Sequence, residues 1–211
     1  MYEAKRQGKS RAVYYPDELH NKVKNRNEII RLLKIAIKEN EFHLVFQPKM
    51  VKEKNSNNYF QEGAEVLMRW ESKNLGIVSP QVFIPIAEES GLMSMIDTWL
   101  IEESAKKIKE MKDKGVNSTF SINVSAKQFS NINLPDNFKE TLEKYDIHPS
   151  AVIIEITESA TIKEPELAKA ILRKFRSFGF GISVDDFGTG YSSISYLRQF
   201  PVTEIKFDKS F

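Results

Sequence analysis

Charged and polar residues interrupt several segments of this chain that otherwise have the composition of buried β-strands. A carboxylate buried without a partner is strongly disfavoured or takes up a proton, so acids at such positions need an explanation. Six polar residues occur in five successive predicted strands: Glu65, Asn123, Glu155, Asp185, Asp186 and Lys206. Each acid could lie in solvent at a strand end or pair with a Lys or Arg. Six such residues together favour a shared site instead.

Oxygen ligands with no cysteine and no nearby histidine are typical of a site for a hard cation, Mg²⁺ or Mn²⁺. Adjacent Asp185 and Asp186, one of them able to bridge, suggest two metals that hold a phosphodiester for in-line attack by water. Lys206 and Arg69 would supply positive charge for the phosphates. The pattern therefore predicts metal-dependent phosphodiester hydrolysis.

The elements that must position these residues alternate between strands and helices. We expect a helix capped by Asn27, followed by an extended run at 41–49 in which Pro48 ends the strand. A polar turn over 51–63 and a strand over 64–70 should follow. Helices should begin at Ser79-Pro80 and near Ser94, and Gly91 and Gly179 should each end a helix. Strands at 119–125, 152–158, 182–188 and 204–208 then alternate with helices at 136–145, 164–178 and 191–200. This alternation predicts parallel βαβ units, in either a doubly wound sheet or a TIM barrel. In a barrel, catalytic groups lie at the C-terminal ends of strands.

Composition narrows the class of protein. The 211 residues carry a formal charge of only +2, which gives no reason to expect nucleic-acid or membrane-surface binding. The chain has no cysteine, and no apolar stretch approaches the roughly 18 residues of a membrane span. We predict a soluble cytoplasmic protein. Residues 1–26 are polar and basic and are interpreted as a linker, with a nucleic-acid-binding arm as the less favoured alternative.

Taken in order, the motifs resemble the EAL family of cyclic-di-GMP phosphodiesterases over residues 28–211. The segments that carry the resemblance are FQPK at 46–49, AEVLMRW at 64–70, SPQVFIPIAEESGL at 79–92, NVSAKQF at 123–129, EITES at 155–159, DDFGTGYSSISYL at 185–197 and FPVTEIKFDKSF at 200–211. The signature triplet is Glu65-Val66-Leu67, with valine in place of alanine. The resemblance implies a barrel of TIM type, in the EAL variant, over residues 27–211.

The resemblance also implies a role for each matching residue. Glu65, Asn123, Glu155 and Asp185 would hold a first metal, and Asp185 would bridge to a second metal that Asp186 also binds. Lys206 would orient the attacking water, and Glu158 would anchor the DDFGTGYSS loop, which couples dimerisation to metal binding. Gln47 and Arg69 would contact the dinucleotide, and the product would be linear pGpG.

Two further expectations concern the ends of the chain. MYEAKRQGKSRAVYY at 1–15 resembles the tail of a diguanylate cyclase (GGDEF) domain, which implies a parent with both domains. The 211 residues contain no AEGVE-like motif and no QGY-like motif. The resemblance implies that the glutamate of the first motif is a second-metal ligand and candidate base, and that the glutamine of the second contacts substrate. The barrel is thus about two strand–helix units short of the roughly 250 residues that are typical.

An unclosed barrel exposes sheet edges, so we expect a homo-oligomer or swapped dimer. The alternatives are a separate polypeptide that completes the barrel, or further residues in the real molecule. We expect the parent to hydrolyse cyclic di-GMP and this chain alone to show little turnover. The alternative from another class is a receptor or interaction module that binds cyclic di-GMP without hydrolysing it.

Overall fold

A single mixed β-sheet organises the chain. The computed structural model describes residues 17–54, 56–157, 164–188 and 199–207. The strands pair in the order β1-β2-β4-β5-β6-β7, and the short β3 pairs with β2. Their bounds are β1 Phe42–Lys52, β2 Tyr59–Ser72, β3 Gly76–Val78, β4 Thr119–Asn123, β5 Val152–Thr157, β6 Gly181–Phe187 and β7 Glu204–Phe207.

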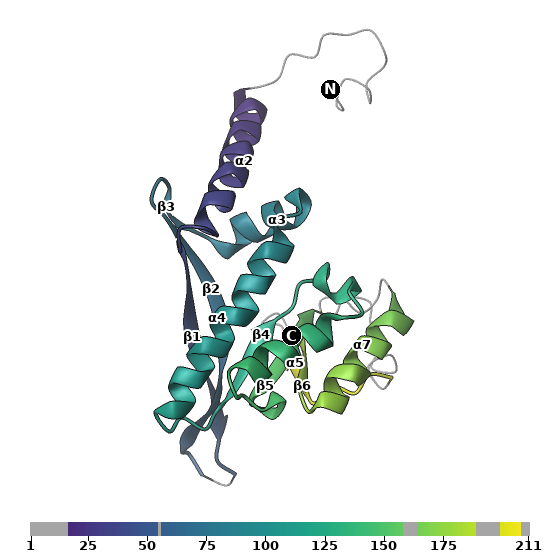
Figure 1. Ribbon diagram of the computed structural model, residues 1–211. Coiled ribbons are helices and arrows are strands. Elements are labelled where there is room, and N and C mark those ends of the chain that lie inside the picture. The colour runs from purple at the N-terminus through teal and green to yellow at the C-terminus, as the bar shows by residue number, and fades with distance from the viewer. Residues whose placement is uncertain (1–16, 55, 158–163, 189–198, 208–211) are drawn as a thin grey trace.

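Helices form a row on one face of this sheet. They are α2 Asp17–Ala36, α3 Pro80–Ser90, α4 Met93–Asp113, α5 Leu134–Lys144 and α7 Pro165–Phe178, with short 3₁₀ turns η1 Gln128–Ser130 and η2 Pro149–Ala151. Each helix packs on the next, α2 on α3, α3 on α4, α4 on α5 and α5 on α7. Figure 1 shows α2 projecting at the top of the molecule and α7 at the opposite end of the row. No helix of the described residues is both long and apolar enough to cross a membrane.

From β2 onward the sheet has the expected parallel βαβ organisation. β2 pairs with β4, β4 with β5, β5 with β6 and β6 with β7, all parallel. The sheet curls, with its helices outside, so the described residues form part of a TIM-type barrel. The predicted fold class is confirmed. The predicted helix at 191–200 and the loop anchor Glu158 lie outside the described residues.

The first two strands are longer than predicted and form an antiparallel hairpin. The expectation that the first strand ends at Pro48 is wrong, because β1 continues to Lys52 and Pro48 pairs with Ala64. Most of the predicted turn at 51–63 therefore belongs to strands. Proline has no backbone N–H to donate to a neighbouring strand. It is tolerated in β1 because β1 is an edge strand of the described sheet and has a neighbour on one side only.

The first helix also differs from the prediction. It begins at Asp17 rather than at Asn27. Residues 17–26 are mostly polar, so the hydrophobic pattern starts only at Ile29 and Ile30, where the helix begins to pack on the core. The boundary of the domain at residues 26 and 27 stays a prediction.

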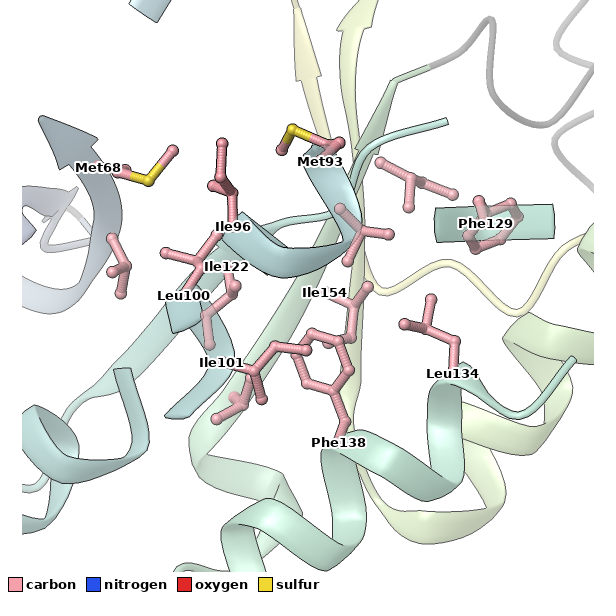
Figure 2. Close-up of a cluster of buried hydrophobic side chains, with 14 of the residues drawn as sticks. Met68, Met93, Ile96, Leu100, Ile101, Ile122, Phe129, Leu134, Phe138 and Ile154 are labelled. Atoms are coloured by element: carbon pink, nitrogen blue, oxygen red, sulfur yellow. The ribbon is translucent and has the colours of Figure 1, made fainter. Parts of the chain in front are cut away.

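Alternation along β2 separates the core from the site. Val66, Met68 and Trp70 are buried on the helix-covered face, whereas Glu65 and Arg69 lie on the other face. Figure 2 shows the core that results: Ile96, Leu100 and Ile101 of α4 and Leu134 and Phe138 of α5 gather near Met68, Ile122 and Ile154 of the sheet. The apolar helix layer thus leaves the opposite face of the sheet for polar side chains.

Two glycines that were expected to end helices do so. Gly91 follows α3 with φ 77°, and Gly179 follows α7 with φ 100°. Both are in the left-handed region, which a side chain disfavours. Gly91 allows the chain to turn sharply from α3 into α4, and Gly179 allows it to turn from α7 into β6.

Candidate metal and phosphodiester site

Lys206 lies at the centre of the acidic residues. Its Nζ donates hydrogen bonds to Glu65 Oε2 at 3.0 Å, Glu155 Oε2 at 3.0 Å and Asp185 Oδ2 at 2.9 Å. These acids come from β2, β5 and β6, and the lysine comes from β7. The curl of the sheet therefore brings together four residues that are spread over 141 positions of sequence.

Asn123, the last residue of β4, joins the same group. Its Nδ2 donates to Glu65 Oε1 at 2.8 Å. Glu65 lies in the middle of β2, but the parallel pairing with β4 covers only Gly63 to Val66. Beyond Val66, β2 pairs only with the antiparallel strands β1 and β3 within the described residues. Glu65 is thus close to the C-terminal end of the parallel part of the sheet, as the barrel prediction requires.

Asp186 lies beside this group on a strained backbone. Its φ is 55°, a left-handed value that is uncommon for a residue other than glycine, and its N–H donates to Asp185 Oδ1 at 2.9 Å. The adjacent aspartates therefore do not alternate across the strand in the ordinary way. Asp186 is exposed, whereas Asp185 is partly buried.

Burial and charge shape the protonation of these groups. Glu155 is fully buried. Burial raises the pKa of Glu155 above its ordinary value, and the charge of Lys206 opposes this rise without cancelling it. Burial by itself would lower the pKa of Lys206, but its hydrogen bonds to Asp185, Glu65 and Glu155 and the negative charge of Glu155 outweigh burial and raise that pKa. Lys206 therefore stays charged.

The donor set fits a hard divalent cation. One carboxylate oxygen each from Glu65, Glu155 and Asp185 lies within 4.8 Å of the others. In addition, Glu155 Oε1 is buried and accepts no hydrogen bond from any described residue. An all-oxygen set with an unsatisfied buried oxygen matches the preference of Mg²⁺ or Mn²⁺.

The two predicted substrate contacts flank the acids on the hairpin. Gln47 of β1 is exposed and pairs with Glu65 in the β1–β2 register. Arg69 lies four residues beyond Glu65 on the same face, about 13 Å further at roughly 3.3 Å per residue. Its Nη1 donates to the Met68 carbonyl at 2.9 Å. The structure thus places both on the face of the sheet that carries the acids.

A second polar layer was not predicted. Lys49, Ser121, Ser183 and Glu204 are linked by hydrogen bonds: Lys49 Nζ donates to Ser121 Oγ at 3.1 Å and to Glu204 Oε1 at 2.5 Å, and Ser183 Oγ donates to Glu204 Oε1 at 3.2 Å. A period of two could have indicated this layer. Ser121, Ser183 and Glu204 each precede a predicted site residue by two positions, and Lys49 follows Gln47 by two.

Comparisons with known proteins identify the family. A family model described as "EAL domain" matches residues 30–211. The chain belongs to the EAL domain family. The expected EAL resemblance is therefore confirmed over nearly the whole described structure.

Relatives of this EAL domain include proteins named as cyclic di-GMP phosphodiesterases. It is 32% identical over its full length to the bifunctional diguanylate cyclase/cyclic di-GMP phosphodiesterase MucR of Pseudomonas aeruginosa, covering 30% of that protein. It is 39% identical to the signaling protein YkoW of Bacillus subtilis and 31% identical to the cyclic di-GMP phosphodiesterase PdeR of Escherichia coli, covering all of this chain and 26% and 31% of theirs. The chain thus spans about a quarter to a third of the length of these relatives.

Solved structures agree with the fold. The EAL domain here resembles the PaMucR phosphodiesterase in complex with c-di-GMP, with a TM-score of 0.80 and 34% identity, over 87% of this chain and 73% of that one. It also resembles the EAL enzyme Bd1971 in its cAMP- and cyclic-di-GMP-bound form, with a TM-score of 0.78 and 33% identity, over 92% of this chain and 51% of that one.

Proposed function

We propose that this EAL domain hydrolyses one phosphodiester bond of cyclic di-GMP to give linear pGpG, with Mg²⁺ or Mn²⁺ bound, in the intact protein that contains it. The observation that carries the proposal is the convergence of Glu65, Glu155 and Asp185 oxygens within 4.8 Å. Relatives whose names include cyclic di-GMP phosphodiesterase activity support the choice of substrate.

Each residue has a role in this proposal. Glu65, Asn123, Glu155 and Asp185 would hold the first cation, and Asp185 and Asp186 would hold a second. A divalent cation bound there supplies electrostatic stabilisation of the phosphate and lowers the pKa of a bound water. Gln47 and Arg69 orient the dinucleotide from the hairpin, and Lys206 directs the attacking water from beside the same carboxylates.

Turnover by the 211 residues alone should be low, because the sequence carries no counterpart of the second-metal glutamate that the EAL resemblance implies. The resemblance of residues 1–15 to the tail of a GGDEF domain supports an upstream GGDEF domain in the parent protein.

For the chain itself we propose a homo-oligomer. Within the described residues β7 is an edge strand, and its Ile205 and Phe207 are 42% and 59% exposed. Light scattering that gives a folded monomer contradicts this assembly.

A non-catalytic cyclic-di-GMP receptor or interaction module is the alternative function. It is favoured by Lys206, whose ammonium group hydrogen-bonds all three carboxylates without a metal. Two measurements separate the functions. Hydrolase activity predicts chromatographic conversion of cyclic di-GMP to pGpG by the intact protein, lost on EDTA treatment and in Glu65→Ala. A receptor predicts calorimetric binding of cyclic di-GMP with no pGpG, and a module for protein partners alone predicts neither.

A further inference from the structure

Lys49 connects the two edges of the described sheet. It belongs to β1, yet its Nζ lies 2.5 Å from Glu204 Oε1 of β7, at the other end of the strand order. The same Nζ lies 3.1 Å from Ser121 Oγ of β4. Both charged side chains are largely shielded from water, with exposed fractions of 22% for Lys49 and 30% for Glu204. The ammonium is therefore held in place from opposite sides of the curl.

That position puts Lys49 behind a proposed metal ligand. Its Nζ is 3.6 Å from Glu155 Oε1, too far for a hydrogen bond but close enough for a strong charge interaction. Glu155 Oε1 accepts no hydrogen bond from the described residues, whereas Glu155 Oε2 accepts from Lys206. The two oxygens of one carboxylate thus have different surroundings, and the ammonium group of Lys49 lies beside Oε1.

The charges of the acidic group around Lys206 and of the second polar layer do not balance. Four carboxylates, those of Glu65, Glu155, Asp185 and Glu204, are linked to two ammonium groups, those of Lys49 and Lys206. The excess is two negative charges, the charge of one divalent cation. Removal of the charge of Lys49 increases the negative excess by one unit, and removal of the charge of Glu204 decreases it by one unit.

We propose that Lys49 and Glu204 are positioning residues that set the affinity of the site for divalent cations through opposite charges behind Glu155. The inference rests on the proposed metal site. Lys49 lowers the attraction of the carboxylates for a cation, and Glu204 holds Lys49 in place and restores part of that attraction. Charges several ångströms apart in partly buried surroundings interact strongly enough to change a dissociation constant by about tenfold.

Binding of Mn²⁺ to the unliganded chain, measured by calorimetry and by the electron paramagnetic resonance signal of free Mn²⁺, tests the inference without activity. We expect Lys49→Met to lower the Kd by about tenfold and Glu204→Gln to raise it by a similar factor. The double variant should return close to the original Kd, because it removes one charge of each sign. Lys49→Arg, which keeps the charge, should stay within about threefold.

Lys52→Met is the matched control, since Lys52 is an exposed lysine on the same strand. Its Kd should not change beyond the screened effect of a distant surface charge. Circular dichroism establishes that each variant is folded. If Lys49→Met does not fold, Lys49→Gln and Lys49→Arg provide the same comparison of lost and retained charge.

The result differs if the ion pair between Lys49 and Glu204 only holds β1 and β7 together. Both single variants then bind Mn²⁺ more weakly and the double variant binds no better, which overturns the inference. Unchanged Kd values in both variants also overturn it while leaving the proposed function intact. Failure of the unaltered chain to bind Mn²⁺ removes the metal site itself, and the inference with it.

Discussion

The ammonium of Lys206 lies 3.0 Å from Oε2 of Glu155, a carboxylate that is fully buried. Glu155 would be strongly disfavoured at this position without a cation, and Lys206 is itself 26% exposed. The pair explains how an acid can occupy an apolar strand. It also means that Lys206 and a divalent cation act on the same oxygens.

Lys206→Met should destabilise the metal-free chain. Glu65, Glu155 and Asp185 each lose a hydrogen-bonded cation, and we expect a loss of roughly 3 kcal/mol, the lower end of the range for broken buried pairs because Lys206 is partly exposed. Urea unfolding measures the loss, and millimolar Mn²⁺ should recover part of it. Lys109→Met, which breaks only an exposed pair with Asp113, is the control and should change little. Equal stability of the two variants contradicts the network.

Glu65→Gln should weaken Mn²⁺ binding by at least about tenfold, since even partners of metal ligands contribute 10- to 100-fold. The amide keeps the size of the side chain and can still meet Asn123, so the fold should hold. Calorimetry measures the affinity, with Glu62→Gln, an exposed acid three residues away on β2, as the control. Unchanged affinity in Glu65→Gln removes Glu65 from the proposed ligands.

Gly63→Ala tests how the pairing of β2 with β4 positions Glu65. A Cβ at Gly63 would lie 2.6 Å from the carbonyl oxygen of Thr119, its partner in the register, so the strands must separate. We expect a loss of about 1–3 kcal/mol, as for other overpacked sites, together with weaker Mn²⁺ binding. Unfolding and calorimetry on the same sample check both. Full stability in this variant means that the strands tolerate a wider spacing.

Asp97 should make stability depend on pH. Burial, with a smaller contribution from the charge of Glu88, raises the pKa of Asp97 to about 7, and Ser125 partly opposes this. Between its ordinary pKa and about 7 the folded chain holds a proton that the unfolded chain has lost. This contribution to stability therefore falls as pH rises through that window and is constant above it.

Asp97→Asn removes the titration. Relative to the unaltered chain, the variant should gain stability between pH 5 and pH 8, by about 2.5 kcal/mol, because about two pH units of the window lie above pH 5. Urea unfolding at the two pH values measures the gain. Asp113→Asn, at an exposed position on the same helix, should show no such difference. A constant gap between Asp97→Asn and the unaltered chain at both pH values contradicts the raised pKa.

The sequence by itself determined the class of fold and most members of the site. Apolar strands alternating with helices indicated parallel βαβ units, and acids within those strands marked Glu65, Glu155 and Asp185, because burial of a carboxylate needs a reason that local pattern can reveal. Gly91 and Gly179 marked helix ends because few other residues adopt a left-handed backbone easily. Residue type, alternation and backbone preference are properties of short segments, so the sequence alone reveals them.

Only the tertiary structure decided which groups meet. The β1–β2 hairpin extends through Pro48 because β1 lies at a sheet edge, and edge position depends on the order of all the strands. Lys206 pairs with three acids, and Lys49 reaches Glu204 across 155 residues, because the sheet curls until strands distant in sequence face one another. Curvature and register are properties of the assembled sheet, so the pairing of charges that sets the site's electrostatics exists only once the chain is folded.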